Sequence, residues 1–472
     1  MFAKLQRIHF VGIGGIGMSG IAEVLLNLGY RVSGSDLKRS AVTDRLASLG
    51  AMIFEGHRAE NVPGSEVVVI SSAIARENPE VAAARTAHIP VIQRAEMLAE
   101  LMRIKYGIAI AGMHGKTTTT SMVAAVLSAA GLDPTVLVGG RVEAMGSNAR
   151  LGRSQYLVAE ADESDRSFLK LSPIISVVTN IDREHMDCYV DMDDVDSAFI
   201  EFCERVPFYG MNVLCADDAR LRSIAPRISR RVVTYGASPD ADFHLHSVGR
   251  GEDSQHFSIT YRGKALGDFG LAVPGMHNVL NATAAIAVGT GLDIPAAKIA
   301  AALREFRGVD RRFQFRGCAG GITIIDDYGH HPTEIRATLS AARERSRGKV
   351  HVIFQPHRYT RTRDLMSDFA SAFHDADSLA VLDIYAASEP PLAGITGESL
   401  ADAIAAEQRS HRHEHSTAVR YCASFEDAVE WTLCNARAGD MILTLGAGNV
   451  VQIGPMLLES LSRPAQRRAI VE

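Results

Sequence analysis

The sequence predicts an α/β protein of three domains, each built around a parallel or mostly parallel sheet. Short apolar, β-branched runs alternate with alanine- and leucine-rich amphipathic stretches, which is the pattern of βαβ units. The alternation occurs in three successive sets, and 472 residues suit about three domains at roughly 100 to 200 residues each. We therefore expect a Rossmann-like N-terminal domain, a central mononucleotide-binding domain with a small antiparallel insert, and a Rossmann-like C-terminal domain.

The predicted strands share a short run of apolar, mostly β-branched residues. They are expected at residues 8–11, 30–35 and 66–71 in a first domain (1–104), at 107–112, 156–162 and 175–182 in a second (105–308), and at 322–327, 350–355, 378–385 and 440–448 in a third (309–472). An alanine-rich helix is expected over 281–289. Between about residues 230 and 275 the strands become short and are separated by Gly and Asp, and these strands, with VVTYG at 232–236 among them, predict the antiparallel insert.

Composition excludes several classes of protein. Lys and Arg total 49 against 55 Asp and Glu, so the chain lacks the positive excess that a nucleic-acid partner requires. Its six cysteines form no C-x-x-C pair, which favours a reducing compartment over a disulfide framework. No run approaches the roughly 18 apolar residues of a membrane span. We expect a cytoplasmic protein, with the tract His411-Arg412-His413-Glu414-His415 as a solvated loop or helix end.

A glycine-rich turn follows the first predicted strand. Gly12, Gly14, Gly15 and Gly17 contain the pattern G-x-G-x-x-G, and Asp36 ends the next strand about twenty residues on. Backbone amides and the helix dipole at such a turn can hold a pyrophosphate, and the acid can bind a ribose hydroxyl. Three interpretations stay open at this point. The turn can belong to an NAD dehydrogenase, it can bind another nucleotide diphosphate, or it can be needed only for packing.

A second phosphate site follows the strand at 107–112. Its G-K-T core predicts a shortened phosphate loop, because Ile110 stands where the full motif has glycine. Gly115 lets the backbone approach phosphates, Lys116 supplies a point charge, and Thr117 offers a hydroxyl to Mg²⁺. The loop and the start of its helix comprise Gly112, Met113, His114, Gly115, Lys116, Thr117 and Thr118.

Acidic residues end the neighbouring strands of the same predicted sheet. Glu160 and Asp162 end one strand, Glu163 and Asp165 follow, and His185 comes soon after the next strand. Taken singly, each acid is more often a helix cap or a solvated charge. Beside a phosphate loop, at the carboxyl ends of parallel strands, they predict a metal cluster.

Seven long motifs resemble the ATP-dependent Mur ligases and cover nearly the whole chain in order. They are GIGGIGMSGIA (12–22), GMHGKTTTT (112–120), EADESD (160–165), TNIDREHMD (179–187), PGMHNVLNA (274–282), DDYGHHPTE (326–334) and QPHRYTRTRDL (355–365). The first and the sixth resemble the alanine-adding members. The resemblance implies a step in peptidoglycan precursor synthesis, in which ATP phosphorylates the lactyl carboxylate of UDP-N-acetylmuramate and the amine of L-alanine attacks the acyl phosphate.

The resemblance also implies the roles of individual residues and makes the three domains UDP-sugar-binding, ATP-binding and amino-acid-binding in turn. Thr117 and Glu160 would bind one Mg²⁺, and Glu160 and His185 a second; with Lys116 and His330 they would form the catalytic set. ATP would be held by the phosphate loop, by Asn278 and Asn281, and by Asp326 and Asp327. The UDP-sugar would be held by Gly12, Gly14, Gly15, Gly17, Asp36 and Ser71, and the amino acid by Tyr328, His330, Arg358 and Arg361.

Met113 departs from the family pattern, since this branch usually carries Thr there. Backbone amides do most of the binding in such a loop, so we expect a modest change in ATP affinity. Two other functions compete with the alanine-adding one. A recycling ligase would attach a preformed peptide to the same nucleotide, and a non-catalytic regulator would bind the nucleotides without turnover. The dehydrogenase alternative leaves the second phosphate site and its metal cluster unexplained.

Overall fold

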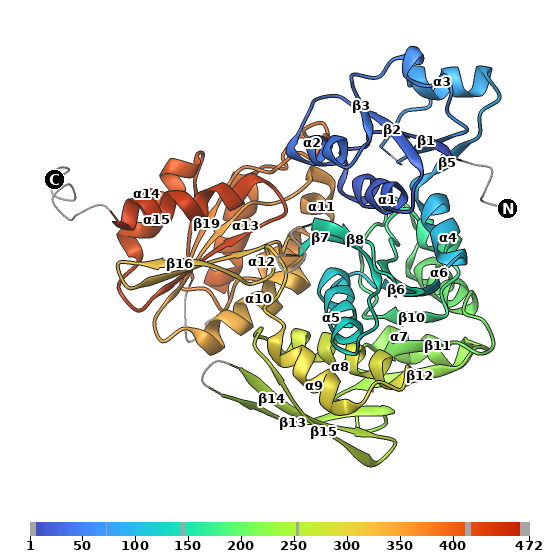
Figure 1. Ribbon diagram of the computed structural model, residues 1–472. Coiled ribbons are helices and arrows are strands. Elements are labelled where there is room, and N and C mark those ends of the chain that lie inside the picture. Colours follow the sequence, from blue (N-terminus) through green and yellow to red (C-terminus); the bar gives the residue numbers. More distant parts are fainter. Residues whose placement is uncertain (1–5, 72, 143–146, 252–253, 411–416, 463–472) are drawn as a thin grey trace. The chain divides into compact units, whose positions relative to one another are not determined.

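The computed structural model describes residues 6–71, 73–142, 147–251, 254–410 and 417–462 (Figure 1). The histidine-rich tract at 411–415 lies outside the described residues. The chain forms two compact units: one contains the residues up to 272 together with 278–309, and the other contains 273–277 and the residues from 310 on. The domain limits at 104/105 and 308/309 stay predictions.

The N-terminal part of the first unit is a five-stranded parallel sheet in the order β3-β2-β1-β4-β5. The three predicted strands are present, and β3 and β5 are added; both are short and half exposed, so neither has the buried apolar run that marks the others. The elements are β1 (Arg7–Val11), α1 (Ile16–Asn27), β2 (Arg31–Asp36), α2 (Ala41–Ser48), β3 (Met52–Glu55), β4 (Val67–Ile70), α3 (Pro79–Thr86), β5 (Val91–Gln93) and α4 (Arg94–Arg103).

The same unit continues into a ten-stranded sheet in the order β15-β14-β13-β12-β11-β10-β6-β9-β7-β8. Its strands are β6 (Tyr106–Ala111), β7 (Thr135–Val142), β8 (Ser147–Arg150), β9 (Tyr156–Glu160), β10 (Ile175–Val178), β11 (Met211–Cys215), β12 (Val232–Gly236), β13 (Phe243–Arg250), β14 (Gln255–Tyr261) and β15 (Lys264–Leu271). Its helices include α5 (Lys116–Ala129), α6 (Met192–Glu204), α7 (Ala219–Ile224), α8 (Met276–Gly291) and α9 (Ala296–Glu305).

The antiparallel insert differs from the prediction at its first strand. Strand β12, the predicted VVTYG strand, pairs in parallel with both β11 and β13, so its assignment to the antiparallel insert is wrong. A short buried β-branched run reads the same in either orientation, and Tyr235 within it is buried. The antiparallel pairing begins only between β13 and β14, and these strands extend the edge of the central sheet.

The second unit holds a six-stranded sheet in the order β16-β17-β21-β18-β19-β20, parallel except for β16. Successive side chains of β18 enter different cores: Val352 and Phe354 lie in one cluster and Ile353 in the other. The sheet is therefore covered on both faces. Its elements are β16 (Gln314–Ala319), β17 (Ile322–Asp327), α10 (Pro332–Arg345), β18 (Val350–Phe354), α11 (Tyr359–Asp364), α12 (Met366–Ala370), β19 (Ser378–Val381), α13 (Gly397–Ser410), β20 (Ala418–Tyr421), α14 (Phe425–Asn435), β21 (Met441–Leu445) and α15 (Ile453–Ser462).

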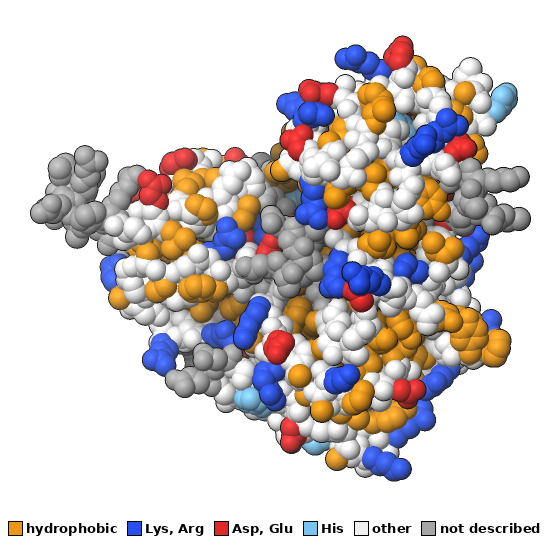
Figure 2. Space-filling view, viewed as in Figure 1, with side chains coloured by type: hydrophobic (Ala, Val, Ile, Leu, Met, Phe, Trp, Pro, Cys, Tyr) orange, Lys and Arg blue, Asp and Glu red, His pale blue; other side chains and the backbone are white. Residues whose placement is uncertain are grey.

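On the face that Figure 2 shows, Lys and Arg side chains are scattered among acidic and hydrophobic ones. Within the described part of the chain, every helix is too short or too polar to cross a membrane.

Candidate active site

The glycine-rich turn joins β1 to α1 and is braced by Asp36. The amide of Gly14 donates a hydrogen bond to Asp36 Oδ2 at 2.8 Å, and the amide of Leu37 donates to Oδ1 at 2.8 Å. Gly15 is the N-cap of α1, and no side chain caps that helix. The turn and the end of β2 therefore meet as the sequence predicts. The carboxylate of Asp36 also shapes the turn itself.

The phosphate loop lies between β6 and α5 and depends on close backbone packing. Gly112 has φ +121°, and a β-carbon there would overlap the hydroxyl of Thr179. The amide of His114 donates to Asn180 Oδ1 at 2.9 Å, and the hydroxyl of Thr179 donates to the carbonyl of His114 at 2.6 Å. Residues just after β10 thus hold the loop, which explains why the predicted strand at 175–182 stops at Val178.

Met113, the departure from the family pattern, is 5% exposed, so its side chain is buried. Its amide donates to the carbonyl of Asn180 at 3.3 Å. Thr117 and Thr118 lie in the first turn of α5, directly behind the loop. The loop backbone is therefore fixed by neighbours on both sides of position 113, independently of the side chain there.

Lys116 is held over its own loop. Its Nζ donates to the carbonyl of Gly112 at 2.6 Å, to that of Met113 at 3.1 Å and to Glu163 Oε1 at 2.7 Å. Burial works against the ammonium, but the carboxylates around it, Glu163 first among them, outweigh burial and raise the pKa of Lys116. Burial also raises the pKa of Glu163, to about 7, although Lys116 opposes this shift. The pair is one coupled charge site.

His185 lies beside two carboxylates. Its Nε2 is 3.8 Å from Glu163 Oε1 and 3.8 Å from Glu184 Oε2. Its φ of +57° lies in the left-handed region, a strained conformation that recurs at functional sites. Glu163 is 1% exposed, and its Oε2 is buried with no hydrogen-bond partner. An unsatisfied buried carboxylate oxygen near an imidazole fits a bound cation.

Sequence reasoning gave Glu163 no individual role. The other acidic residues of the segment 160–165 show the same sequence pattern. Only the burial of Glu163 distinguishes it from them. Another pair formed by distant segments is His114 with Asp182, whose Nε2 and Oδ2 lie 3.0 Å apart.

Asn281 of α8 lies beside the phosphate loop, and Asn278 lies one turn before it on the same helix. Asn278 and Asn281 are both buried, and the amide of Asn281 donates to Asn278 Oδ1 at 3.4 Å. A β-carbon at Gly115 would lie 2.8 Å from Asn281 Oδ1. The spacing of three residues places both amides on one helix face. The structure thus brings Asn281 against the loop, as expected for a residue of the same site.

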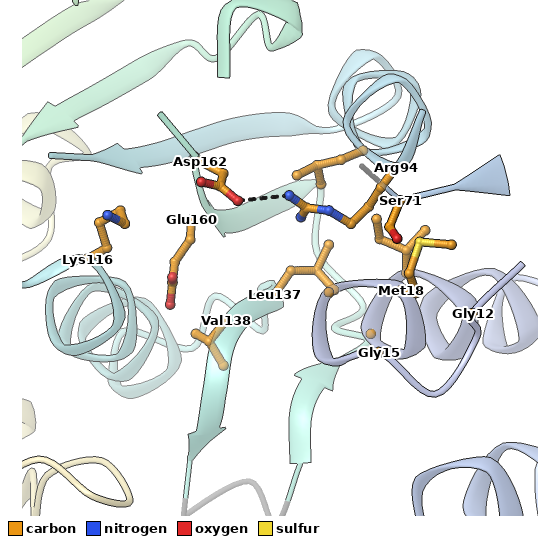
Figure 3. Close-up of a pocket in the computed structure, with 14 residues that line it drawn as sticks. Gly12, Gly15, Met18, Ser71, Arg94, Lys116, Leu137, Val138, Glu160 and Asp162 are labelled. Carbon is orange, nitrogen blue, oxygen red and sulfur yellow. Dashed lines mark hydrogen bonds and ion pairs between the residues drawn. The ribbon is translucent and has the colours of Figure 1, made fainter. Parts of the chain in front are cut away.

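A cleft of about 400 Å³ joins the glycine-rich turn to the phosphate loop (Figure 3). Lys116 and Glu160 lie at one end of it, and Ser71, Met18 and Arg94 lie at the other. Arg94 was not predicted, since it starts an ordinary amphipathic helix and its partner is distant in the sequence. The cleft is lined by Gly12, Gly15, Gly17, Met18, Gly20, Ile21, Ser71, Arg94, Leu98, Lys116, Leu137, Val138, Glu160 and Asp162.

In the second unit, Asp326 and Asp327 end β17 and are buried and hydrogen-bonded. Asp326 accepts from Arg311 Nε at 3.1 Å and from the hydroxyl of Thr444 at 2.6 Å. Asp327 accepts from the amides of Phe313 and Gly329, each at 2.7 Å. Burial raises the pKa of Asp327. These aspartates order the loops around them.

The residues predicted to bind the incoming amino acid lie near one another within this unit. Ring centroids of Tyr328 and His330 are 5.6 Å apart, those of His330 and His357 are 5.6 Å apart, and His357 stacks on Tyr385 at 5.5 Å. Arg361 Nη1 lies 3.3 Å from His357 Nδ1. Burial lowers the pKa of His357 to about 3, and nearby cationic groups add to the effect. Sequence reasoning missed His357 and Tyr385.

Arg358 is oriented by an acid that sequence reasoning also missed. Its Nε donates to Glu389 Oε1 at 2.6 Å, and Thr360 donates to the same carboxylate through its amide and its hydroxyl. Burial would raise the pKa of Glu389, but hydrogen bonds from Thr360 and Arg358 outweigh it and lower the pKa. The guanidinium of Arg358 is therefore fixed at the start of α11. Arg358 is the N-cap of this helix and has a backbone φ of +73°.

Three family models match successive parts of the chain. Residues 7–106 match the Mur ligase family catalytic domain, 110–289 the Mur ligase middle domain, and 311–448 the Mur ligase glutamate ligase domain.

Relatives match over nearly the full length. The UDP-N-acetylmuramate--L-alanine ligase of Koribacter versatilis is 68% identical over 98% of both chains. That of Acidobacterium capsulatum is 63% identical over 98% of this chain and 99% of its own. The crystal structure of UDP-N-acetylmuramate-alanine ligase MurC from Thermotoga maritima superposes with a TM-score of 0.79 at 30% identity, covering 96% of this chain and 98% of that one. A murein peptide ligase from Psychrobacter arcticus, 23% identical with a TM-score of 0.67, covers 97% and 99% and shares the fold.

Proposed function

The chain belongs to the Mur ligase family, and on that premise we propose that it joins L-alanine to the lactyl carboxylate of UDP-N-acetylmuramate while ATP is cleaved to ADP and phosphate. This reaction is a step of peptidoglycan precursor synthesis. The observation that carries the proposal is the 68% identity, over 98% of both chains, to a protein named for this activity. The proposed compartment is the cytoplasm, which agrees with the scattered cysteines.

The proposed reaction has two steps, phosphorylation of the carboxylate and attack by the amine. A lactyl carboxylate oxygen attacks the γ-phosphorus of ATP, the bond to ADP breaks, and an acyl phosphate forms. The amine of L-alanine then attacks the acyl carbon, and phosphate leaves with the oxygen it took from the carboxylate. The amine loses its proton and the amide remains. Both steps bring anions or electron-rich groups together, so positioning and positive charge dominate catalysis.

Lys116 supplies positive charge at the phosphate loop. Its ammonium donates to Glu163 and to two loop carbonyls. A bound nucleotide would exchange these partners for phosphoryl oxygens, which is the role proposed for this lysine. The loop amides and the N-terminus of α5 would bind the remaining phosphate oxygens.

Thr117, Glu160 and His185 are the proposed ligands of Mg²⁺. Hydroxyl and carboxylate oxygens suit this hard cation, and the unsatisfied buried oxygen of Glu163 adds negative charge at the same place. When bound, Mg²⁺ would neutralise the repulsion between the carboxylate and the γ-phosphate. The proposed binding site for L-alanine consists of Tyr328, His330, Arg358 and Arg361.

Phosphate release tests the function against its two alternatives. Purified protein with ATP and UDP-N-acetylmuramate should release phosphate only when a free amino acid is added, with L-alanine preferred. Release supported by a preformed peptide and not by alanine would favour the recycling ligase. Absence of release with every acceptor would favour a binding protein.

A further inference from the structure

Arg94 connects two parts of the cleft that belong to different family models. It is the first residue of α4, within the match to the first model (7–106), and its partner Asp162 lies within the match to the second (110–289). Arg94 Nη2 donates to Asp162 Oδ2 at 3.1 Å (Figure 3). The Arg94 side chain is 23% exposed, so it is accessible from the cleft without being fully solvated.

The guanidinium of Arg94 lies against the first turn of α1. A β-carbon at Gly17 would lie 3.0 Å from Arg94 Nη1 and 3.1 Å from its Cδ, so the small residue makes room for this side chain. The same turn has neither a capping side chain nor an acidic residue. A helix N-terminus and a guanidinium therefore converge on one place, and both attract anions.

Asp162 holds Arg94 through one of its oxygens. Its other oxygen, Oδ1, accepts from the amide of Ser164 at 3.1 Å and from the hydroxyl at 2.6 Å. Ser164 thus orients the carboxylate, and the carboxylate orients the arginine. The ion pair also keeps the partly buried guanidinium from being an isolated charge.

We propose that Arg94 binds an anionic group of the muramyl nucleotide, either its diphosphate or its lactyl carboxylate, and that Asp162 keeps Arg94 in position for this contact. The inference rests on the proposed function, which places this nucleotide in the cleft. Lys116 provides a positive charge at the end of the cleft near the phosphate loop, and Arg94 provides one at the end near the glycine-rich turn. A planar guanidinium can give two parallel hydrogen bonds to a phosphate or a carboxylate.

A matched ion pair nearby provides the control. Lys170, at the end of a short 3-10 helix (Ser167–Lys170), pairs with Glu96 of α4 and does not line the cleft. Lys170→Met removes one positive charge and one ion pair between the same two segments as Arg94→Met does. If Arg94 only fastened these segments together, the two substitutions would have similar effects.

The test measures dissociation constants by isothermal titration calorimetry for UDP-N-acetylmuramate and for UDP. Arg94→Met should weaken binding of the muramyl nucleotide roughly 10- to 100-fold, as expected for a lost charge-assisted hydrogen bond. Lys170→Met should change it less than about threefold, as surface pairs do. An equal loss for UDP identifies the diphosphate as the contact, whereas a loss confined to the muramyl nucleotide identifies the carboxylate.

Equal binding by Arg94→Met and Lys170→Met would overturn the inference. Arg94→Lys, which keeps the charge and the stem, serves if the methionine variant is unfolded, and it should bind several-fold more weakly than the natural protein; unchanged binding would again overturn the inference. Failure of the natural protein itself to bind UDP-N-acetylmuramate would contradict the proposed function, a result distinct from the loss of Arg94 alone.

Discussion

Glu160 and Glu163 lie three residues apart and have different environments. Glu160 lines the cleft at the end of β9, whereas Glu163 is buried against Lys116. The sequence presents both as acids after a strand, and burial alone distinguishes them. The metal ligand proposed from the family resemblance is the one that faces the cleft, and the buried one orients the lysine.

Glu160→Gln should lower kcat by at least about 100-fold with little change in thermal stability. The substitution removes a full negative charge from the proposed position between two Mg²⁺ ions, while the side chain keeps its size. Steady-state phosphate release and a thermal melt measure the two quantities. His185→Ala should be partly rescued by high Mg²⁺. Near-normal turnover of the glutamine variant would show that the metal assignment is wrong.

Arg358→Lys and Arg361→Lys should raise the KM for alanine far more than those for ATP or the muramyl nucleotide. Losing a charge-assisted pair to a desolvated carboxylate costs about 2 to 5 kcal/mol, and lysine cannot reproduce the two-point contact. Arg363→Lys is the control, because that side chain lies on the same helix, is 53% exposed and pairs with Asp364. An equal rise in all three KM values would show that these arginines do not bind the incoming amino acid.

At the scale of elements, the phosphate loop shows what the sequence could predict. The strand, the glycines and the helix start fall where the motif requires, because each follows from local chemistry. The contacts of the loop with Thr179, Asn180 and Asn281 come from segments far along the chain. Single-sequence patterns carry no information about such pairs.

Gly112→Ala should abolish binding of a non-hydrolysable ATP analogue and lower the thermal midpoint. The residue has φ +121°, and an added β-carbon would collide with Thr179. Gly131→Ala is the control for backbone strain alone, since its φ is +85° and no atom lies within 4 Å of the added carbon. The control should cost about 1 kcal/mol of stability and leave nucleotide binding intact. Equal behaviour of the two variants would contradict the packed geometry of the loop.

A buried carboxylate joins α3 to the N-terminal sheet. Glu80 is fully buried; it accepts from Ser35 Oγ at 2.5 Å and from Asn61 Nδ2 at 2.6 Å, and His9 Nε2 lies 3.5 Å from it. Burial would raise the pKa of Glu80, but the nearby imidazole of His9 and the hydrogen bonds from Ser35 and Asn61 outweigh it and lower the pKa from 4.5 to about 2. The folded state therefore favours the ionised form.

The stability that Glu80 contributes should be lost on acidification. A carboxyl with a lowered folded pKa stabilises the protein above its unfolded pKa, and this contribution falls between about pH 4.5 and pH 2. Glu80→Gln should lower stability at pH 7 by about 3 kcal/mol and reduce the pH dependence in that window. Thermal melts from pH 7 to pH 2 measure both effects. An unchanged pH profile would show that the network does not depend on the charge.

At the scale of the whole molecule, the three sheets follow from the alternation of strands and helices. Long buried strands such as β6 and β17 were predicted, because their apolar runs are continuous. The short, half-exposed β3 and β5 were not, and the parallel pairing of β12 could not be read from its composition. The candidate site residues show the same difference. The motif residues were predicted, whereas Arg94, Glu163 and His357 stand out only through partners that the folded chain supplies.

The proposed reaction passes through an acyl phosphate that forms from the muramyl carboxylate and is consumed by alanine. Its most direct test uses UDP-N-acetylmuramate labelled with ¹⁸O in the lactyl carboxylate, together with ATP and L-alanine, and measures the released phosphate and the nucleotide product by mass spectrometry. We predict that each phosphate carries one oxygen from the carboxylate and that the product gains one alanine through an amide. Phosphate without the label, or release that does not depend on alanine, would contradict the account.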